Sequence, residues 1–266
     1  MRIFLMRLMM RSTLKFWVSL FATLMLLVFS ATACASAGQS GSGQLTDTEF
    51  ETKVLEVIRK NPKAILDSIQ AYDQAQRQQQ AKLRDQVLQQ IKQEPRLIIR
   101  NSPVMGATAQ KIILAEFSDF QCPFCAKAHA IVKEFMAKHK DEVTLVYKQF
   151  PLVQIHPQAL PAALASWAAG QQGKFWEYHD GLFEQQEKLD ESFYPTLAQS
   201  LKLDVDKFNQ DRNSEAAKTA VQKDMELGQN LGIRGTPTFI FNGFLFSGVA
   251  EAADLESYLA QIKAAK

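Results

Sequence analysis

The chain has 266 residues, of which 22% are charged, and a formal net charge of +2 at pH 7. Four basic residues lie within the first 33, so the remainder carries a charge near −2 (+2 minus 4). No basic patch is visible in the sequence, which excludes nucleic acid as an expected partner. The remaining chain is long enough for an ordinary hydrophobic core to hold the fold.

Residues 1–33 have the layout of a secretory signal peptide. Basic residues precede an apolar run from Phe16 to Ala33, and no acidic residue occurs among the first 45. The run ends in small residues, which favours cleavage. An uncleaved membrane anchor is the alternative, because the run is near the lower length limit for a spanning helix. We therefore expect an exported protein, periplasmic or otherwise extracytoplasmic.

Cys34 follows this run directly. The sequence "SATAC" is similar to a bacterial lipobox, in which the cysteine becomes the lipidated first residue, although Ala31 stands where Leu is more common. Ordinary cleavage after "ATA" or "ASA" is the alternative. Residues 34–45 are small and polar, as in a flexible tether. We expect a membrane-tethered lipoprotein with Cys34 as the lipidation candidate.

Residues 46–95 predict an N-terminal helical arm. Thr46 with Glu49 three residues later fits a capping box at the start of a first helix. Pro62 ends that helix and suits the first turn of a second one, which we expect to reach Gln93.

The second helix of the arm is rich in glutamine. Its apolar residues keep a 3-4 spacing that Gln76 and Gln79 interrupt. A solvated linker and an oligomerisation stalk both fit this pattern. We favour the stalk, and with it a homo-oligomer, because so long a helix with little to pack on is marginal alone.

Residues 96–156 predict a strand–helix–strand unit. "RLII" and "KIILAEF" are short apolar runs, and the second has the composition of a buried central strand. The helical pattern of "QCPFCAKAHAIVKEFMAKH" and then the strand pattern of "VTLVYKQF" follow. The two cysteines therefore lie where the first strand meets the helix.

Residues 157–230 are nearly all helical in pattern, and residues 231–266 return to strands and a last helix. Asn242-Gly243 between two β-rich runs predicts a type I′ hairpin. The expected class is α/β: a thioredoxin fold in two halves, with an inserted helical domain between them and the helical arm before them. A CxxC that opens a helix beside a βαβ pattern is typical of that fold.

Cys122 and Cys125 could bind a metal, form a structural staple or act as a redox couple. A structural zinc site requires four ligands, and only His129, expected to be a partly exposed helix residue, lies near them in sequence. Cu(I) on two thiolates, as in a periplasmic copper-binding protein, stays an alternative. A disulfide across so short a loop stabilises little. We favour redox chemistry, with no metal and no organic cofactor.

The helix start favours different roles for the two thiols. Cys122 would face the unpaired N–H groups and the positive end of the helix dipole, and both stabilise the reactive thiolate. Cys125 would lie one turn further and deeper. We therefore expect Cys122 to attack and Cys125 to resolve the mixed disulfide. Pro123 fixes the backbone of that first turn.

The sequence "EFSDFQCPFC" resembles the active-site segment of the DsbA-like branch of the thioredoxin superfamily. "RGTPTFIFNG" resembles that family's cis-proline loop, and "IHPQALPAALASWAAGQQGKFWEYHDGLF" is similar to its inserted helical domain. The resemblance covers about residues 96–266. The arm is similar to the stalks of oligomeric DsbA-like proteins linked to disulfide isomerisation and copper tolerance.

The resemblance implies further site residues. Thr236 and Pro237 would form the cis peptide that faces the cysteines and binds a client strand. Glu116 would be the buried acid that moves a proton for the resolving thiol, with a raised pKa. Its alternative is an edge position that faces water.

Phe124 departs from the strongly oxidising members, which carry His at this position. Since Phe offers no donor, we expect a less acidic Cys122 and a less oxidising couple. Thr236 also resembles the isomerase members. We predict an enzyme, a protein-disulfide oxidoreductase that leans to isomerase or reductase, with a disulfide-donating oxidase as the alternative. Its expected partners are cysteine-containing clients and a membrane thiol–disulfide redox partner.

Overall fold

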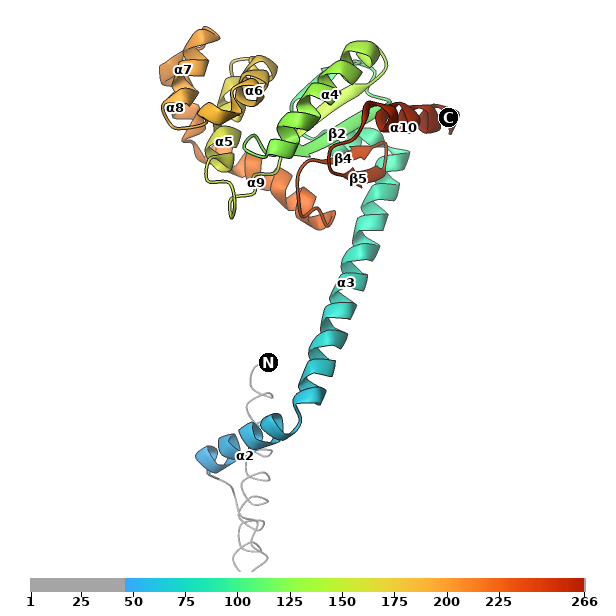
Figure 1. Ribbon diagram of the computed structural model, residues 1–266, viewed down its shortest axis with the longest axis vertical. Helices are drawn as coiled ribbons and strands as arrows, with labels where there is room; N and C mark the ends of the chain where they lie inside the picture. Colours follow the sequence, from blue (N-terminus) through green and yellow to red (C-terminus); the bar gives the residue numbers. More distant parts are fainter. Residues whose placement is uncertain (1–45, 266) are drawn as a thin grey trace, which may run out of the picture. The chain divides into compact units, whose positions relative to one another are not determined.

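The computed structural model describes residues 46–265. The predicted signal peptide, the lipidation candidate Cys34 and the tether lie outside these residues. By the density of its internal contacts the chain divides into two compact units between Ile65 and Leu66. Figure 1 shows the elements in chain order. No helix within residues 46–265 is long and apolar enough to span a bilayer.

The arm consists of the two predicted helices, α2 (Asp47–Lys60) and α3 (Pro62–Gln93). The capping box is present at α2: the Thr46 hydroxyl accepts from the Glu49 amide at 3.3 Å, and the Glu49 carboxylate accepts from the Thr46 amide at 3.0 Å. All residues from 46 to 80 are exposed. The last turns of α3 pack on the domain that follows, where Ile91 is buried.

A five-stranded mixed sheet forms the centre of the domain. Its strands are β1 (Val104–Gly106), β2 (Ile113–Ser118), β3 (Thr144–Gln149), β4 (Thr238–Phe241) and β5 (Phe244–Ser247), in the order β1-β3-β2-β4-β5. Strands β2 and β3 are parallel and are joined through α4 (Pro123–His139), while the other pairs are antiparallel. This is the predicted βαβ half followed by a ββα half, and the predicted fold class is confirmed.

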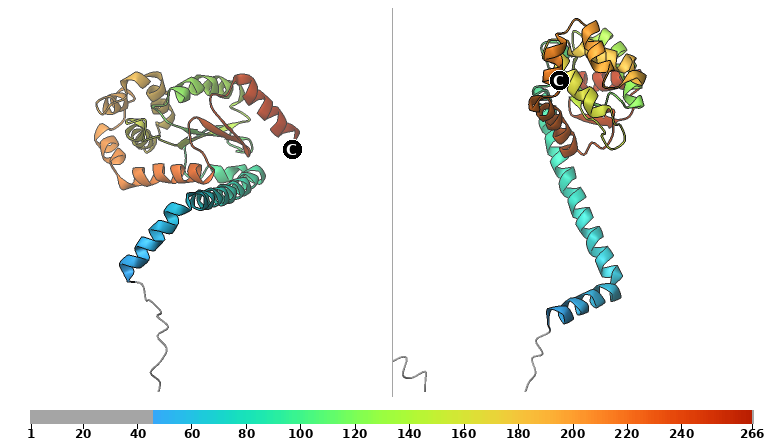
Figure 2. Two further views of the ribbon diagram at one scale, coloured as in Figure 1. Left: turned by 60° about the horizontal axis from the view of Figure 1, so that its bottom comes forward. Right: turned by 90° about the vertical axis from the view of Figure 1, so that its left-hand side faces the viewer.

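Helices cover both faces of the sheet (Figure 2). Helices α4 and α10 (Ala252–Ala264) bury apolar residues against one face. The other face packs on the end of α3, on η1 (Pro95–Ile98) and on α9 (Glu215–Asn230). Helix α9 approaches closely because Gly228 has no side chain: a Cβ there would lie 2.6 Å from the Phe150 ring.

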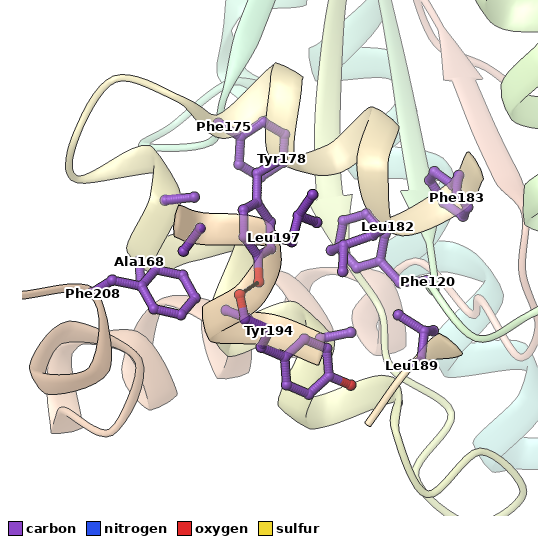
Figure 3. Packing of buried hydrophobic residues seen from close by; sticks show 14 of the residues in the cluster. Phe120, Ala168, Phe175, Tyr178, Leu182, Phe183, Leu189, Tyr194, Leu197 and Phe208 are labelled. Carbon is purple, nitrogen blue, oxygen red and sulfur yellow. Dashed lines mark hydrogen bonds between the residues drawn. The ribbon is translucent and has the colours of Figure 1, made fainter. Parts of the chain in front are cut away.

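The helical insertion lies between β3 and β4. It contains α5 (Ala159–Gly170), α6 (Phe175–Glu184), η2 (Gln186–Lys188), α7 (Phe193–Ser200) and α8 (Val205–Arg212), and leads into α9. Its core is aromatic, and the Tyr178 hydroxyl donates to the Tyr194 carbonyl at 2.9 Å (Figure 3). Phe120, from the segment before the cysteines, enters the same core and joins the insertion to the active-site segment.

Two local features differ from the sequence pattern. "RLII" is one of the apolar runs, yet it lies in and beside the 3-10 helix η1 rather than in a strand. Strand β1 was not predicted. It has three exposed residues and pairs with β3 at the sheet edge, so no buried alternation marks it in the sequence.

Candidate active site

The two cysteines lie at the start of α4. Cys122 is the N-cap residue, and Pro123 is the first residue of the helix. The Cys125 amide donates to the Cys122 carbonyl at 3.0 Å, which brings the two residues within one turn. Both thiols are free, with exposures of 3% for Cys122 and 0% for Cys125.

The loop before β4 faces Cys122. The Cys122 Sγ lies 3.4 Å from the Thr236 carbonyl oxygen, and the Thr236-Pro237 peptide bond is cis. A cavity of about 380 Å³ opens beside this loop and is lined by residues 232–238 together with Leu245, Ser247 and Gly248. The structure thus brings Cys122, Cys125, Thr236 and Pro237 together, while their roles stay predictions.

The surroundings separate the pKa values of the two thiols. A hydrogen bond from Cys125 lowers the pKa of Cys122 to about 5, against the effect of burial, and Thr236 and the amides of residues 124 and 125 add to the lowering. Burial raises the pKa of Cys125 far above its ordinary value. Near neutral pH, Cys122 is therefore the thiolate and Cys125 the thiol, which matches an attacking and a resolving cysteine.

Glu116 is buried in the central strand β2, and not at a water-facing edge. Burial raises the pKa of its carboxyl to about 7, against the effects of the Ser118 hydroxyl and of His129. A carboxyl that titrates near pH 7 can accept and return a proton under the conditions in which the enzyme would work.

Asp119 fixes the backbone on both sides of the site, a role that the sequence did not suggest. Its Oδ1 accepts from the Gln121 amide at 2.8 Å. Its Oδ2 accepts from the Leu152 amide at 3.0 Å and pairs with His156 Nδ1 at 2.7 Å. The loop after β3 is therefore held to the segment that precedes Cys122.

Gln186 in η2 joins the insertion to the active-site backbone. Its amide nitrogen donates to the Phe120 carbonyl at 2.7 Å and to the Cys122 carbonyl at 3.0 Å. A glutamine more than sixty positions from the cysteines carries no local sequence signal for this contact.

Exposed apolar side chains lie next to Cys122 in the sequence and on the loop after β3. Phe124, between the cysteines, is 57% exposed, and Val153 and Ile155 are exposed on the loop that Asp119 holds. Such a surface suits an unfolded chain, which presents apolar side chains of its own.

The expectation that His129 is partly exposed was wrong. His129 is buried on α4, and its Nε2 lies 2.9 Å from Asp180 Oδ1, which also lies 3.0 Å from His179 Nδ1. The ligand atoms of these three residues lie within 4.8 Å of one another and could hold a metal ion. The sequence did not reveal this group because α4 and α6 supply its members. That the protein uses no metal stays a prediction.

The fold and the site define a class of protein. A CxxC pair at a helix start, one thiol acidic and the other buried, opposite a cis-proline in a thioredoxin fold, is the site of the thiol–disulfide oxidoreductases. The Thioredoxin family model matches residues 99–264, and the chain belongs to that family.

Solved structures agree with this class. A thioredoxin-like oxidoreductase from Silicibacter pomeroyi shares 29% identity at a TM-score of 0.59, covering 63% of this chain and 95% of that one. Oxidised BdbD from Bacillus subtilis shares 25% identity at a TM-score of 0.55, covering 62% of this chain and 95% of that one. Proteus mirabilis ScsC in a transitional conformation has the same fold at 20% identity and a TM-score of 0.58, covering 82% of this chain and 97% of that one.

The curated relatives match this chain over one segment of their own length. Na(+)/H(+) antiporter NhaA 1 of Mycolicibacterium vanbaalenii is 36% identical over 154 residues, which is 57% of this chain. The chain spans about a quarter of the length of such relatives, 25% for this antiporter. A match of that extent shows a shared segment and carries no transport activity to this protein.

Proposed function

We propose that this protein is an exported thiol–disulfide oxidoreductase that acts on protein cysteines as an isomerase or reductase. One observation carries the proposal: the Cys122 sulfur lies at the start of α4, 3.4 Å from the Thr236 carbonyl oxygen, and the Cys125 thiol is buried one turn further along the helix. Cys122 attacks a client disulfide and forms a mixed disulfide. Cys125 then attacks Cys122 and releases the client.

The apolar surface around Cys122 supports a protein client over a small thiol. Phe124 projects beside the nucleophile, and the residues of the loop after β3 extend the surface. The backbone of Thr236 would pair with an extended client segment, as strand addition requires.

The arm supports isomerisation. An isomerase must stay reduced, and a membrane thiol–disulfide partner would keep it so in an oxidising compartment. A stalk that gathers several active sites around a common axis would shield them from the enzymes that oxidise single sites. The exposed apolar residues of α2 favour such an assembly.

Two assays test the proposal. Wild-type protein should reduce insulin with a thiol donor and should recover activity from a scrambled disulfide protein. Cys122→Ser should abolish both activities, while Cys125→Ser should trap mixed disulfides with the client. No turnover above the Cys122→Ser background in either assay would refute the proposal.

A disulfide-donating oxidase is the second candidate, and the pKa of Cys122 near 5 favours it. A stabilised thiolate stabilises the reduced protein, so its disulfide is a stronger oxidant. The reduction potential in a glutathione buffer, with the oligomeric mass from the same preparation, separates the two. An oxidising couple in a monomer would indicate the oxidase, and a more reducing couple in an oligomer would indicate the isomerase or reductase.

A further inference from the structure

Three buried side-chain oxygens of β2 and β3, near the resolving cysteine, make no hydrogen bond of good geometry within the described residues. They are Glu116 Oε1, Ser118 Oγ and Tyr147 Oη. All three residues are buried within the sheet. Buried polar groups in folded proteins are nearly always paired, so a cluster of three such oxygens near a reactive thiol calls for a role that explains it.

The register of the sheet places these groups on one face. Glu116 and Ser118 are two residues apart on β2, so their side chains point to the same side. Tyr147 is the partner of Glu116 on the parallel strand β3. Leu114, two residues before Glu116, packs with α4 on this side, and Cys125 lies in the first turn of α4.

The Ser118 hydroxyl affects the pKa values of Glu116, Tyr147 and the nearby Cys125. Burial raises the pKa of Glu116 to about 7, and the Ser118 hydroxyl opposes that shift. The same hydroxyl opposes the upward shifts that burial causes in Cys125 and Tyr147. Ser118 therefore stands close to both the thiol that must lose a proton and the carboxyl that can accept one. His129 on α4 is the further titratable group that acts on Glu116.

We propose that the Ser118 hydroxyl relays the proton between the Cys125 thiol and the Glu116 carboxylate, and that the Tyr147 hydroxyl positions this carboxylate. The inference rests on the proposed function, since it concerns the step in which Cys125 resolves the mixed disulfide. A serine hydroxyl rotates about one bond and both donates and accepts, so it can serve the two groups in turn.

Resolution begins with proton transfer. Ser118 Oγ accepts the proton of Cys125 and passes its own proton to the ionised Glu116. The Cys125 thiolate attacks Cys122 Sγ, and the bond between Cys122 and the client sulfur breaks. The client thiolate leaves with the electron pair, so the client disulfide is reduced and the Cys122–Cys125 pair is oxidised. The reverse sequence serves oxidation.

An aromatic disulfide, 5,5′-dithiobis-(2-nitrobenzoate), separates the two halves of the reaction. Attack by Cys122 on the probe releases one coloured thiolate, and resolution by Cys125 releases a second. In Ser118→Ala we expect the first phase to be unchanged and the second to slow about tenfold or more at pH 7, within the range for positioned proton transfer. In Tyr147→Phe the second phase should slow less, and its pH midpoint should move.

Two matched variants control for structural damage. Ser166→Ala removes a buried hydroxyl that is bonded to Gln149 and Ala163, and Tyr178→Phe removes one bonded to Tyr194. Both should lower the thermal midpoint and leave the second phase unchanged. Ser118→Ala and Tyr147→Phe should lower the midpoint no more than these two controls do, because neither hydroxyl makes a hydrogen bond of good geometry within the described residues. Ser118→Ala should add no further slowing to Glu116→Gln, because both variants interrupt one path.

The possible outcomes distinguish a failure of the proposed relay from a failure of the proposed function. If the wild-type protein fails to release the second thiolate and to reduce insulin, the proposed function fails. If the wild-type protein works and Ser118→Ala and Tyr147→Phe keep its second phase, only the relay is overturned. The relay is overturned too if Ser166→Ala slows the second phase as much as Ser118→Ala does.

Discussion

Cys122 and Cys125 show how a helix start can give two equal side chains opposite chemistry. At the N-cap position Cys122 lies beside the Cys125 thiol and the amides of residues 124 and 125, which together lower its pKa to about 5. One turn further, Cys125 is enclosed by protein and keeps its proton. The same hydrogen bond stabilises the Cys122 thiolate and disfavours ionisation of Cys125. The difference between the two pKa values therefore depends on the presence of both cysteines.

The first prediction concerns that hydrogen bond. In reduced wild-type protein the rate of Cys122 alkylation should rise through a midpoint near pH 5 and level off by pH 7. Cys125→Ala removes the donor and should move the midpoint upward by about one unit or more. Cys125→Ser keeps a donor and should retain most of the lowering. Iodoacetamide kinetics across pH provide the measurement, and equal midpoints in all three proteins would contradict it.

The second prediction concerns Glu116. Its pKa is about 7 in the folded protein against an ordinary 4.5, so the folded state binds more protons between these values. The stabilising contribution of the protonated carboxyl is present below pH 4.5 and is lost as pH rises through 7. Glu116→Gln should therefore be more stable than wild type at pH 8, by on the order of 3 kcal/mol for 2.5 units (7 minus 4.5), and nearly equal at pH 4. Urea unfolding at both pH values measures this; an equal effect at both would contradict it.

Short sequence motifs predicted the helix bounds and the hairpin turn well. A capping box and Pro62 set the bounds of α2 and α3, and positive φ angles at Asn242 and Gly243 fit the predicted I′ turn. What the sequence did not reveal depends on distant contacts. Lys148 is a charged residue inside a buried strand, and its partner Asp224 comes 76 positions later. No periodic pattern encodes such a pair.

The Lys148–Asp224 pair joins three elements. Lys148 Nζ donates to Asp224 Oδ1 at 3.0 Å, to Ser102 Oγ at 2.7 Å and to the Ile99 carbonyl at 3.2 Å. Asp224 Oδ2 accepts from the Gln149 amide at 3.1 Å. The pair thus fixes α9 and the turn after η1 to the end of β3.

The third prediction follows from this burial. Asp224→Ala leaves the Lys148 ammonium buried without its counter-ion and should lower the free energy of unfolding by about 3–5 kcal/mol. Lys148→Met combined with Asp224→Leu removes both charges and should restore much of that loss. Lys133→Ala removes two ion pairs of an exposed lysine, with Asp180 and Glu184, and should cost less than about 1 kcal/mol. Urea titrations of the four proteins test this, and a milder loss in Asp224→Ala than in Lys133→Ala would refute it.

Helix α2 exposes apolar side chains and buries none of its own residues. Phe50, Val54, Leu55, Val57 and Ile58 are all exposed. Fourteen residues are short for a helix that must hold alone in water. Packing such stripes on copies of themselves buries this surface, as helices with apolar seams do in bundles.

The fourth prediction is that α2 assembles the enzyme and that assembly sets its activity. Wild-type protein should sediment as a dimer or trimer, and Leu55→Glu with Ile58→Glu should convert it to monomer by placing charge in the apolar seam. Thr52→Glu adds charge at a polar position of the same helix and should leave the mass unchanged. Because the redox site lies in the domain that follows, the monomer should keep insulin reduction and lose most of its recovery of a scrambled disulfide protein. A wild-type monomer would contradict the prediction. A monomeric variant with full isomerase activity would also contradict it, because it would show that the arm is not required for isomerisation.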